Sequence, residues 1–190
     1  MWRKAIYMRK LAYLVGLFVL ASLPAAAQES RTTDLSAEYS FVRANPATTG
    51  FPSFNANGGT ASLAWNPRSW VGIAGEFGDY HVGQIGSASV DTNLMTYMVG
   101  PRLYFHHFGR FTPFAQELFG GAHSSSAGFG ISGSRNSFAM ALGGGVDVPF
   151  RGHWSVRLGP VDYLITDFNE VGGRKLQNNL RVSGGVRWRF

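Results

Sequence analysis

From residue 35 to the C-terminus, large apolar residues alternate with small or polar ones. Successive residues of a β-strand face opposite sides of the sheet, so a period of two predicts strands with two different faces. In 35–41, for example, four apolar residues interleave with Ser36, Glu38 and Ser40. Eight such stretches occur, at 35–41, 60–65, 71–78, 95–105, 111–122, 138–148, 154–159 and 179–190. The pattern therefore predicts an all-β chain of eight strands.

The connections between these stretches alternate between long and short. Three are tight, at 66–69, 106–110 and 151–153. Four are long and rich in Gly, Ser, Asn and Asp, at roughly 43–58, 79–92, 123–136 and 167–178. In an antiparallel up-and-down meander this order places every long loop at one end, with both chain termini at the short-turn end.

The way in which large and small residues divide between the two faces of the strands predicts whether the sheet faces water or lipid. The large apolar residues share one face of each strand, whereas the other face carries small residues and the charges. A soluble eight-stranded barrel needs the reverse arrangement, and a closed barrel is the sheet that leaves no backbone group unpaired in a bilayer. We therefore expect residues 34–190 to form an eight-stranded antiparallel up-and-down transmembrane β-barrel. Aromatic residues near the strand ends predict two interfacial girdles on its outer surface: Phe41, Trp65, Trp70, Tyr80, Phe105, Phe111, Phe150, Trp154, Phe168, Trp188 and Phe190.

The first 27 residues have the layout of a cleavable secretory signal peptide. A basic start precedes the apolar run 11–23, and the small residues Ala25 and Ala27 stand where the peptidase cuts, after Ala27. The apolar run is too short for a transmembrane helix. Met8 is an alternative start, because the basic residues after it would suffice. A short segment, 28–33, then leads into the barrel.

Charge and cysteine content exclude several function classes. The net charge of +6 suggests a nucleic-acid partner, but removal of the signal peptide takes away four basic residues and no acid, which leaves +2. Of the basic residues that remain, only Lys175 is a lysine, so we expect no nucleic-acid binding. The absence of cysteine excludes disulfides, thiol nucleophiles and iron–sulfur clusters.

The C-terminus carries a motif of its own. Ser183 is polar, Gly185 follows two positions later, Trp188 is third from the end, and Phe190 is terminal. With the segments 100–104, 162–164 and 178–183, it makes the chain resemble the small eight-stranded bacterial outer-membrane β-barrels, OmpA-like and OmpX-like, of the outer membrane protein beta-barrel domain family. The resemblance implies a Gram-negative outer-membrane location and contact with outer-membrane lipid. It also implies that periplasmic chaperones and the barrel-assembly machinery, which recognises this C-terminal signal, act during biogenesis.

The charged face of the strands predicts ion pairs inside the barrel. It carries Glu38, Glu76 and Asp147 together with Arg102, Arg157, Arg181 and Arg187. The tight turn at 151–153 sets Asp147 opposite Arg157, and closure of the last strand on the first sets Glu38 between Arg181 and Arg187. Gln116 and Glu117 have opposite parity, and because an ionised carboxylate facing lipid is costly we expect Glu117 inside or near the loop end. We expect a plugged, salt-bridged interior.

Catalysis would require a serine, a histidine and an orienting group close together outside the barrel. His106, His107 and His153 lie in the short turns, whereas His81 and His123 stand at the roots of long loops, with Ser124–Ser126 beside His123. This pattern indicates neither a catalytic site nor a metal or cofactor site. We expect a non-enzymatic barrel with an envelope-structural or surface-interaction role, exerted through four long extracellular loops toward an unidentified ligand. The alternatives are a narrow, porin-like pore and a lipid A-modifying enzyme.

Overall fold

The computed structural model describes residues 31–190 except 46–52, 86–87, 107, 129–130 and 171–172, and omits the side chains of 84–91, 126–133 and 168–176. The predicted signal peptide, with Ala25 and Ala27, lies outside the described residues. Of the expected segment 28–33 only the last part is described, and the first strand already begins at Thr32. Among the described residues, no helix is long and apolar enough to cross a membrane.

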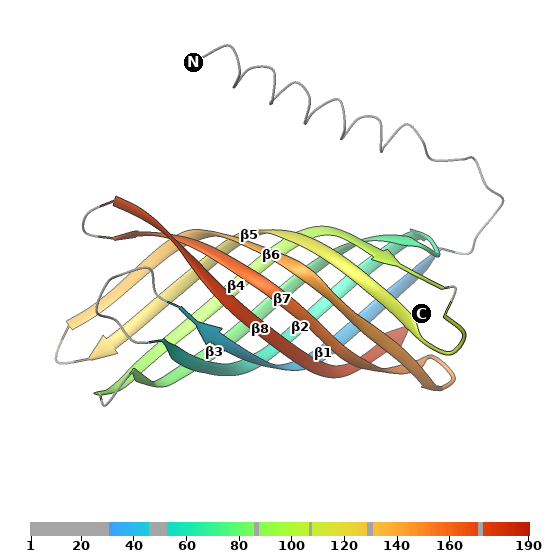
Figure 1. The fold of residues 1–190 in the computed structure, drawn as a ribbon, viewed down its shortest axis with the longest axis horizontal. Coiled ribbons are helices and arrows are strands. Elements are labelled where there is room, and N and C mark those ends of the chain that lie inside the picture. The colour runs from blue at the N-terminus through green and yellow to red at the C-terminus, as the bar shows by residue number, and fades with distance from the viewer. Residues whose placement is uncertain (1–30, 46–52, 86–87, 107, 129–130, 171–172) are drawn as a thin grey trace, which may run out of the picture.

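The chain forms a closed barrel of eight strands in sequence order (Figure 1). Every neighbouring pair is antiparallel, and β8 pairs with β1 to close the sheet. The predicted eight-stranded up-and-down barrel is therefore confirmed. The strands are β1 (Thr32–Ala44), β2 (Phe54–Arg68), β3 (Val71–Ile85), β4 (Ala88–Tyr104), β5 (Thr112–Gly128), β6 (Ile131–Arg151), β7 (Trp154–Glu170) and β8 (Gly173–Arg189).

The short turns lie where the sequence places them. β2 and β3 are joined at 69–70, and β6 and β7 at 152–153, where Gly152 has a φ of 52° that suits glycine. Between β4 and β5 the chain makes a small bridge from Phe108 to Phe111. The backbone N–H of Phe190 donates to the carbonyl of Thr33 at 2.8 Å, so the barrel closes at this short-turn end.

The opposite end differs from the expectation of four long loops. β5 and β6 remain paired out to Gly128 and Ile131, and β7 and β8 out to Glu170 and Gly173. Similarly, β3 and β4 pair up to Ile85 and Ala88. Backbone pairing needs no apolar side chains, so the Gly-, Ser- and Asn-rich stretches extend three hairpins instead of forming loops. Between β1 and β2, by contrast, the described ladder ends at Ala44 and Phe54.

The two faces of the strands divide as predicted. Leu63 and Leu142 on the outer surface are 54% and 52% exposed, whereas Asp147 and Arg157 inside are fully buried. Turn-proximal aromatics such as Trp154 and Trp188 lie on the outer surface. Tyr80 was wrongly assigned to the outer girdle: it has the inward parity of β3 and is fully buried. The outer surface of the strands is thus largely apolar, and the inside holds the buried charges.

A bulge in β7 changes which parity points inward. The pairing of β7 shifts between Leu158 and Val161, around Gly159 and Pro160. Gly159 has a φ of 98°, and an added Cβ there would lie 2.8 Å from the Cα of Gly145 on β6. Because Pro lacks an N–H, it is tolerated inside a strand only at such an irregularity. After the bulge, Asp162 points into the barrel.

Candidate functional site

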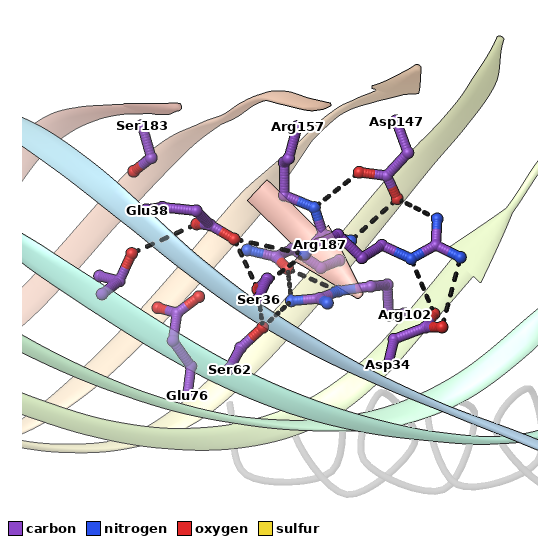
Figure 2. A network of polar contacts seen from close by, with 12 residues as sticks. Asp34, Ser36, Glu38, Ser62, Glu76, Arg102, Asp147, Arg157, Ser183 and Arg187 are labelled. Carbon is purple, nitrogen blue, oxygen red and sulfur yellow. Dashed lines mark hydrogen bonds and ion pairs between the residues drawn. The ribbon is translucent and has the colours of Figure 1, made fainter. Parts of the chain in front are cut away.

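The most prominent chemical feature is a group of charged side chains inside the barrel (Figure 2). Its tightest contact joins neighbouring strands: Arg157 donates through Nε to Asp147 Oδ1 at 2.7 Å and through Nη2 to Oδ2 at 2.9 Å. Both side chains are fully buried. The two residues are paired across β6 and β7, so register alone brings them together. Bidentate contacts of this kind are geometrically specific as well as strong.

Asp147 also links to the closing strand. Arg187 on β8 donates through Nη1 to Asp147 Oδ2 at 2.6 Å, and its Nε lies 3.2 Å from Asp34 on β1. Arg189 and Tyr104 reach the same Asp34 carboxylate, at 3.0 Å and 3.1 Å. Asp34 is therefore the acid at the short-turn end of the interior.

Glu38 has a partner other than those expected. It is paired with Gly185 on β8, between the register positions of Arg181 and Arg187, but its ion pair is with Arg157, at 3.3 Å. Two hydroxyls fix the carboxylate: Ser36 donates to Oε1 at 2.7 Å and Thr60 to Oε2 at 3.2 Å. The register of Glu38 is as predicted, but Arg157 on β7 is paired with the same Gly185, so the two charged side chains meet over this glycine of β8.

A second set of contacts centres on Arg181 of β8. Its guanidinium reaches Glu76 on β3 at 2.5 Å, forms an ion pair with Asp162 on β7, and donates to the Tyr80 hydroxyl at 2.9 Å. The Arg181 and Asp162 side chains are fully buried, and Glu76 nearly so. One arginine thus neutralises acids from two strands on different sides of the barrel.

Arg102 and Gln116 join the two sets. Arg102 donates through Nε and Nη2 to Gln116 Oε1, at 3.0 Å and 2.7 Å, and Gln116 Nε2 donates to Asp162 at 3.3 Å. Arg102 also donates to Ser62 at 3.3 Å, and Ser62 bonds Ser36 at 2.7 Å. The resulting interior network is continuous and draws on all eight strands: Asp34, Ser36, Glu38, Ser62, Glu76, Arg102, Gln116, Asp147, Arg157, Asp162, Arg181 and Arg187.

Aromatic rings stack against the guanidinium groups of this network. Arg157 and Arg102 lie over the Phe114 ring, 4.5 Å and 5.3 Å from its centroid. Arg187 lies 5.6 Å from the centre of the Tyr104 ring. Both rings point inward and are buried. They fill the space between charged groups and add a cation–π attraction.

Beyond the network, toward the long-hairpin end, the interior becomes apolar. Buried side chains from seven strands pack there, and we call them the apolar layer: Val42, Ala56, Tyr80, Val82, Met98, Leu118, Ala122, Ala139, Ala141 and Leu164. Phe54 and Leu94 pack against it. The described interior beyond the network is therefore largely apolar, with the buried polar side chains of Thr96, Thr166 and Asn179 among the apolar ones.

Five members of the network are not among the predicted ion-pair residues: Ser36 and Ser62, whose hydroxyls link charged groups, and Asp34, Gln116 and Asp162. Asp34 continues the alternation of β1 and could have been found by extending it by one residue. Asp162 requires the bulge, for which Pro160 inside a strand is the available signal. Gln116 has the inward parity of β5, so Glu117 does not: the expectation of Glu117 inside was wrong. Glu117 is half-buried on the outer surface, paired with Leu142 at mid-strand.

The C-terminal motif residues have distinct surroundings. The Ser183 hydroxyl bonds Ser40 on β1 at 2.7 Å. A Cβ added at Gly185 would lie 2.1 Å from the carbonyl oxygen of Ala37, so the closing strands approach too closely there for any side chain. Trp188 stacks on Trp154 and on Phe190, with ring centroids 5.2 Å and 4.9 Å apart. The motif contributes to the seam that closes the barrel.

The two histidines expected at loop roots lie on the outer surface of paired strands. His81 Nδ1 is 2.9 Å from Asn93 Oδ1 across β3 and β4, and His123 Nδ1 is 2.6 Å from Asn136 Oδ1 across β5 and β6. Both imidazoles thus engage a cross-strand amide. Among the described residues, no group of three His, Cys, Asp or Glu side chains is arranged to hold a metal ion.

Solved structures share this fold. Neisserial surface protein A (NspA) superposes with a TM-score of 0.68 at 15% identity, over 85% of this chain and all of that one. Ail, the attachment invasion locus protein of Yersinia pestis, gives 0.59 at 17% identity over 85% of this chain and 100% of its own. OprG from Pseudomonas aeruginosa gives 0.51 at 10% identity, over 86% of this chain and 98% of its own. No curated protein sequence matches the chain.

The family assignment rests on the sequence. Residues 13–190, nearly the whole chain, match the family model described as the outer membrane protein beta-barrel domain. The match agrees with the closed antiparallel barrel, its apolar outer surface and its charged interior. This chain belongs to the outer membrane protein beta-barrel domain family and is a bacterial outer-membrane protein.

Proposed function

We propose that this protein is a non-enzymatic outer-membrane barrel that serves envelope structure or surface interaction and does not conduct solutes. Its interior network fills the half of the barrel near the short turns. Arg102, Arg157 and Arg181 are each at most 1% exposed, although each carries a charge. An aqueous pore would leave such groups hydrated, and eight strands enclose little more than the space that side chains fill.

The apolar layer supports the same proposal. Leu118 and Leu164 are fully buried on the interior side of β5 and β7, and Val42 and Val82 are nearly so. An ion would have to shed its hydration to pass such a layer, which is costly. The apolar layer therefore opposes the passage of ions beyond the interior network.

The hairpins at the other end carry the proposed interaction. β5 and β6 extend as a paired hairpin through Ser124 and Arg135, and polar side chains such as Arg43 and Asn55, joined at 2.8 Å, face outward at the end of β1 and β2. Rigid hairpins present polar groups beyond the membrane with little loss of entropy on binding. Ail, which shares the fold, has been solved with the heparin analogue sucrose octasulfate. We therefore include a sulfated polysaccharide among the extracellular ligands to be tested.

Planar-bilayer recording tests the absence of conduction. The purified barrel should give no conductance above that of the lipid alone. Arg181→Ala with Glu76→Ala removes charge from the centre of the network and is a control for whether an opened interior conducts. Conductance by the unmodified barrel would favour a pore and contradict the proposal.

A shortened hairpin tests the surface role. Replacing residues 124–135 by Asn-Gly would join His123 directly to its partner Asn136 through a two-residue turn. We expect the shortened barrel to keep its heat-modifiable migration on detergent gels but to lose binding to heparin or to host cells. Equal binding by both forms would show that this hairpin takes no part in the interaction.

The enzyme alternative has its own test. Lipid A from cells with and without the protein should have identical mass spectra. Specific loss of an acyl chain in the presence of the protein would overturn the non-enzymatic proposal. In biogenesis, we propose that periplasmic chaperones and the barrel-assembly machinery recognise the C-terminal motif.

A further inference from the structure

A groove of about 590 Å³ crosses the lipid-facing surface over β2–β5. Its walls are large apolar side chains: Leu63, Val99 and Phe119 on one side, and Phe77 and Tyr97 on the other. Cross-strand pairing puts Leu63, Gly75, Val99 and Phe119 in one row. The groove has the size of pockets that hold small ligands, which span about 300–1,000 Å³.

Gly75 forms the open part of this groove, and the packing of the barrel does not require a glycine there. An added Cβ at Gly75 would meet nothing within 4 Å. At Gly58, Gly100 and Gly120, by contrast, the Cβ would lie 1.9 Å, 2.0 Å and 1.9 Å from a carbonyl oxygen of the neighbouring strand. Those three glycines permit close approach of strands, whereas Gly75 leaves space on the outside.

A glycine in a strand weakens the strand unless something else fills its place. The neighbours of Gly75 in its row are Leu63 and Val99, which are 54% and 56% exposed and cover the outer surface around it. We propose that the groove holds an acyl chain of a membrane lipid, which takes the place of the missing side chain. The groove is continuous with the lipid-facing surface, so its occupant enters from the bilayer.

Ala61 on β2 lines the groove on the side of the long-hairpin end, and beyond it Gly59 is paired with the exposed Asp79. Ala61 and Gly59 on β2 are exposed, and a Cβ at Gly59 would make only an ordinary contact, 3.6 Å from the carbonyl oxygen of Glu38. Next along β2 is Asn57, which accepts a hydrogen bond from Tyr39 at 3.2 Å. His81 is paired with Asn57. Polar side chains therefore stand where the headgroup of an outer-leaflet lipid would lie, and the apolar groove stands beneath them.

Native mass spectrometry of the barrel released from phosphatidylcholine nanodiscs tests this proposal. We expect the unmodified protein to keep one phosphatidylcholine after the other lipids are stripped. Gly75→Phe fills the groove and should abolish the retained lipid, whereas Gly75→Ala, whose Cβ meets nothing, should keep it. Leu142→Phe adds a ring to the lipid-facing surface of β6, away from the groove, and should keep the lipid.

Heat-modifiable migration shows whether the Gly75→Phe barrel folds. If it does not, Ala61→Phe, which narrows the same groove from its other end, replaces it in the test. Retention of the lipid by a folded Gly75→Phe or Ala61→Phe barrel would overturn the proposal. A dimer of the unmodified barrel that Gly75→Phe dissociates would also overturn the proposal, because the groove would then bind a second copy of the chain. The result of this test does not depend on whether the barrel conducts ions or whether its hairpins bind a ligand.

Discussion

Arg157 on β7 binds Asp147 on β6 through two parallel hydrogen bonds, of 2.7 Å and 2.9 Å, with both side chains fully buried. The same Asp147 carboxylate accepts from Arg187 on β8, and the same Arg157 reaches Glu38 on β1. Two neighbouring residues thus connect four strands. Loss of either one would leave charges of the other strands without their partners.

Replacing Asp147 by Ala should destabilise the barrel by about 3–5 kcal/mol, because it removes the carboxylate that Arg157 and Arg187 share and leaves each of them with one buried ion pair fewer. The free energy of unfolding by urea in lipid vesicles measures the effect. Asp79→Asn is the matched control: its carboxylate is exposed on the outer surface, so the change should be within about 0.5 kcal/mol. Equal effects of the two substitutions would show that burial of the pair does not matter.

Arg102→Met should cost less than Arg157→Met. Arg102 binds the neutral Gln116 and Ser62, so its removal leaves no acid without an ion-pair partner. We expect the free energy of unfolding to fall by about 1 kcal/mol. Removal of Arg157 leaves Asp147 and Glu38 each with one fewer cation, and we expect about 3–5 kcal/mol. The same unfolding measurement compares them. The reverse order would contradict the assignment of partners.

Gly185→Ala should destabilise the seam between β1 and β8 by roughly 1–3 kcal/mol, because the new Cβ would lie 2.1 Å from the Ala37 carbonyl oxygen. Gly184→Ala is the control, since its Cβ would meet its nearest neighbour, the carbonyl oxygen of Arg157, at 3.8 Å. The temperature at which the heat-modifiable band unfolds reports the difference. A similar shift for both would contradict the steric argument.

Glu117→Leu should stabilise the barrel by about 1–2 kcal/mol, because a carboxyl group at mid-strand on the lipid-facing surface is unfavourable there. Urea unfolding in vesicles measures the gain. Gln116→Leu is the control at the adjacent residue, which faces the interior. It deprives Arg102 and Asp162 of a hydrogen-bond partner and should destabilise the barrel. A loss of stability for Glu117→Leu would indicate that the carboxyl group has a partner in the membrane.

Deletion of Phe190 should reduce the amount of barrel assembled in the outer membrane. Its ring stacks on Trp188, and its backbone N–H closes the barrel onto Thr33 at 2.8 Å. Fractionated membranes probed by immunoblot give the measurement. Phe150→Ala removes an equally exposed aromatic ring that is not part of the C-terminal motif, and assembly should continue. Normal assembly without Phe190 would show that the motif is not the signal.

The fold could be predicted because the period of two and the choice of bulky face depend only on local sequence. The contact of Asp147 with Arg157 follows in the same way, since a tight turn fixes their register. The contact of Arg181 with Glu76 does not, because β8 and β3 are not neighbours and the contact crosses the barrel interior. Whether a side chain reaches across depends on barrel diameter and strand stagger, which no local pattern contains.

The omission of Asp162 and the misassignment of Glu117 have local causes. The bulge at Gly159 and Pro160 inverts the parity of β7, so counting residues from Arg157 places Asp162 on the wrong face. At Glu117, the cost of a carboxylate facing lipid suggested the inward face, but Arg102 requires the amide of Gln116 there and the two cannot both point inward. The long loops were overestimated because hairpin pairing leaves no apolar signature in the sequence.

The interior network also bears on how the barrel can be built. Among the side chains that the structure describes, β8 supplies Arg181 and Arg187, two of the four buried arginines, whereas the five buried acids all come from earlier strands. A sheet that lacks its last strand would carry an excess of three negative charges on the face that becomes the interior. Insertion of β8 therefore neutralises the interior in the same step that closes it. A barrel without β8 is therefore disfavoured by repulsion among its excess negative charges, and pairing of the last strand removes this repulsion.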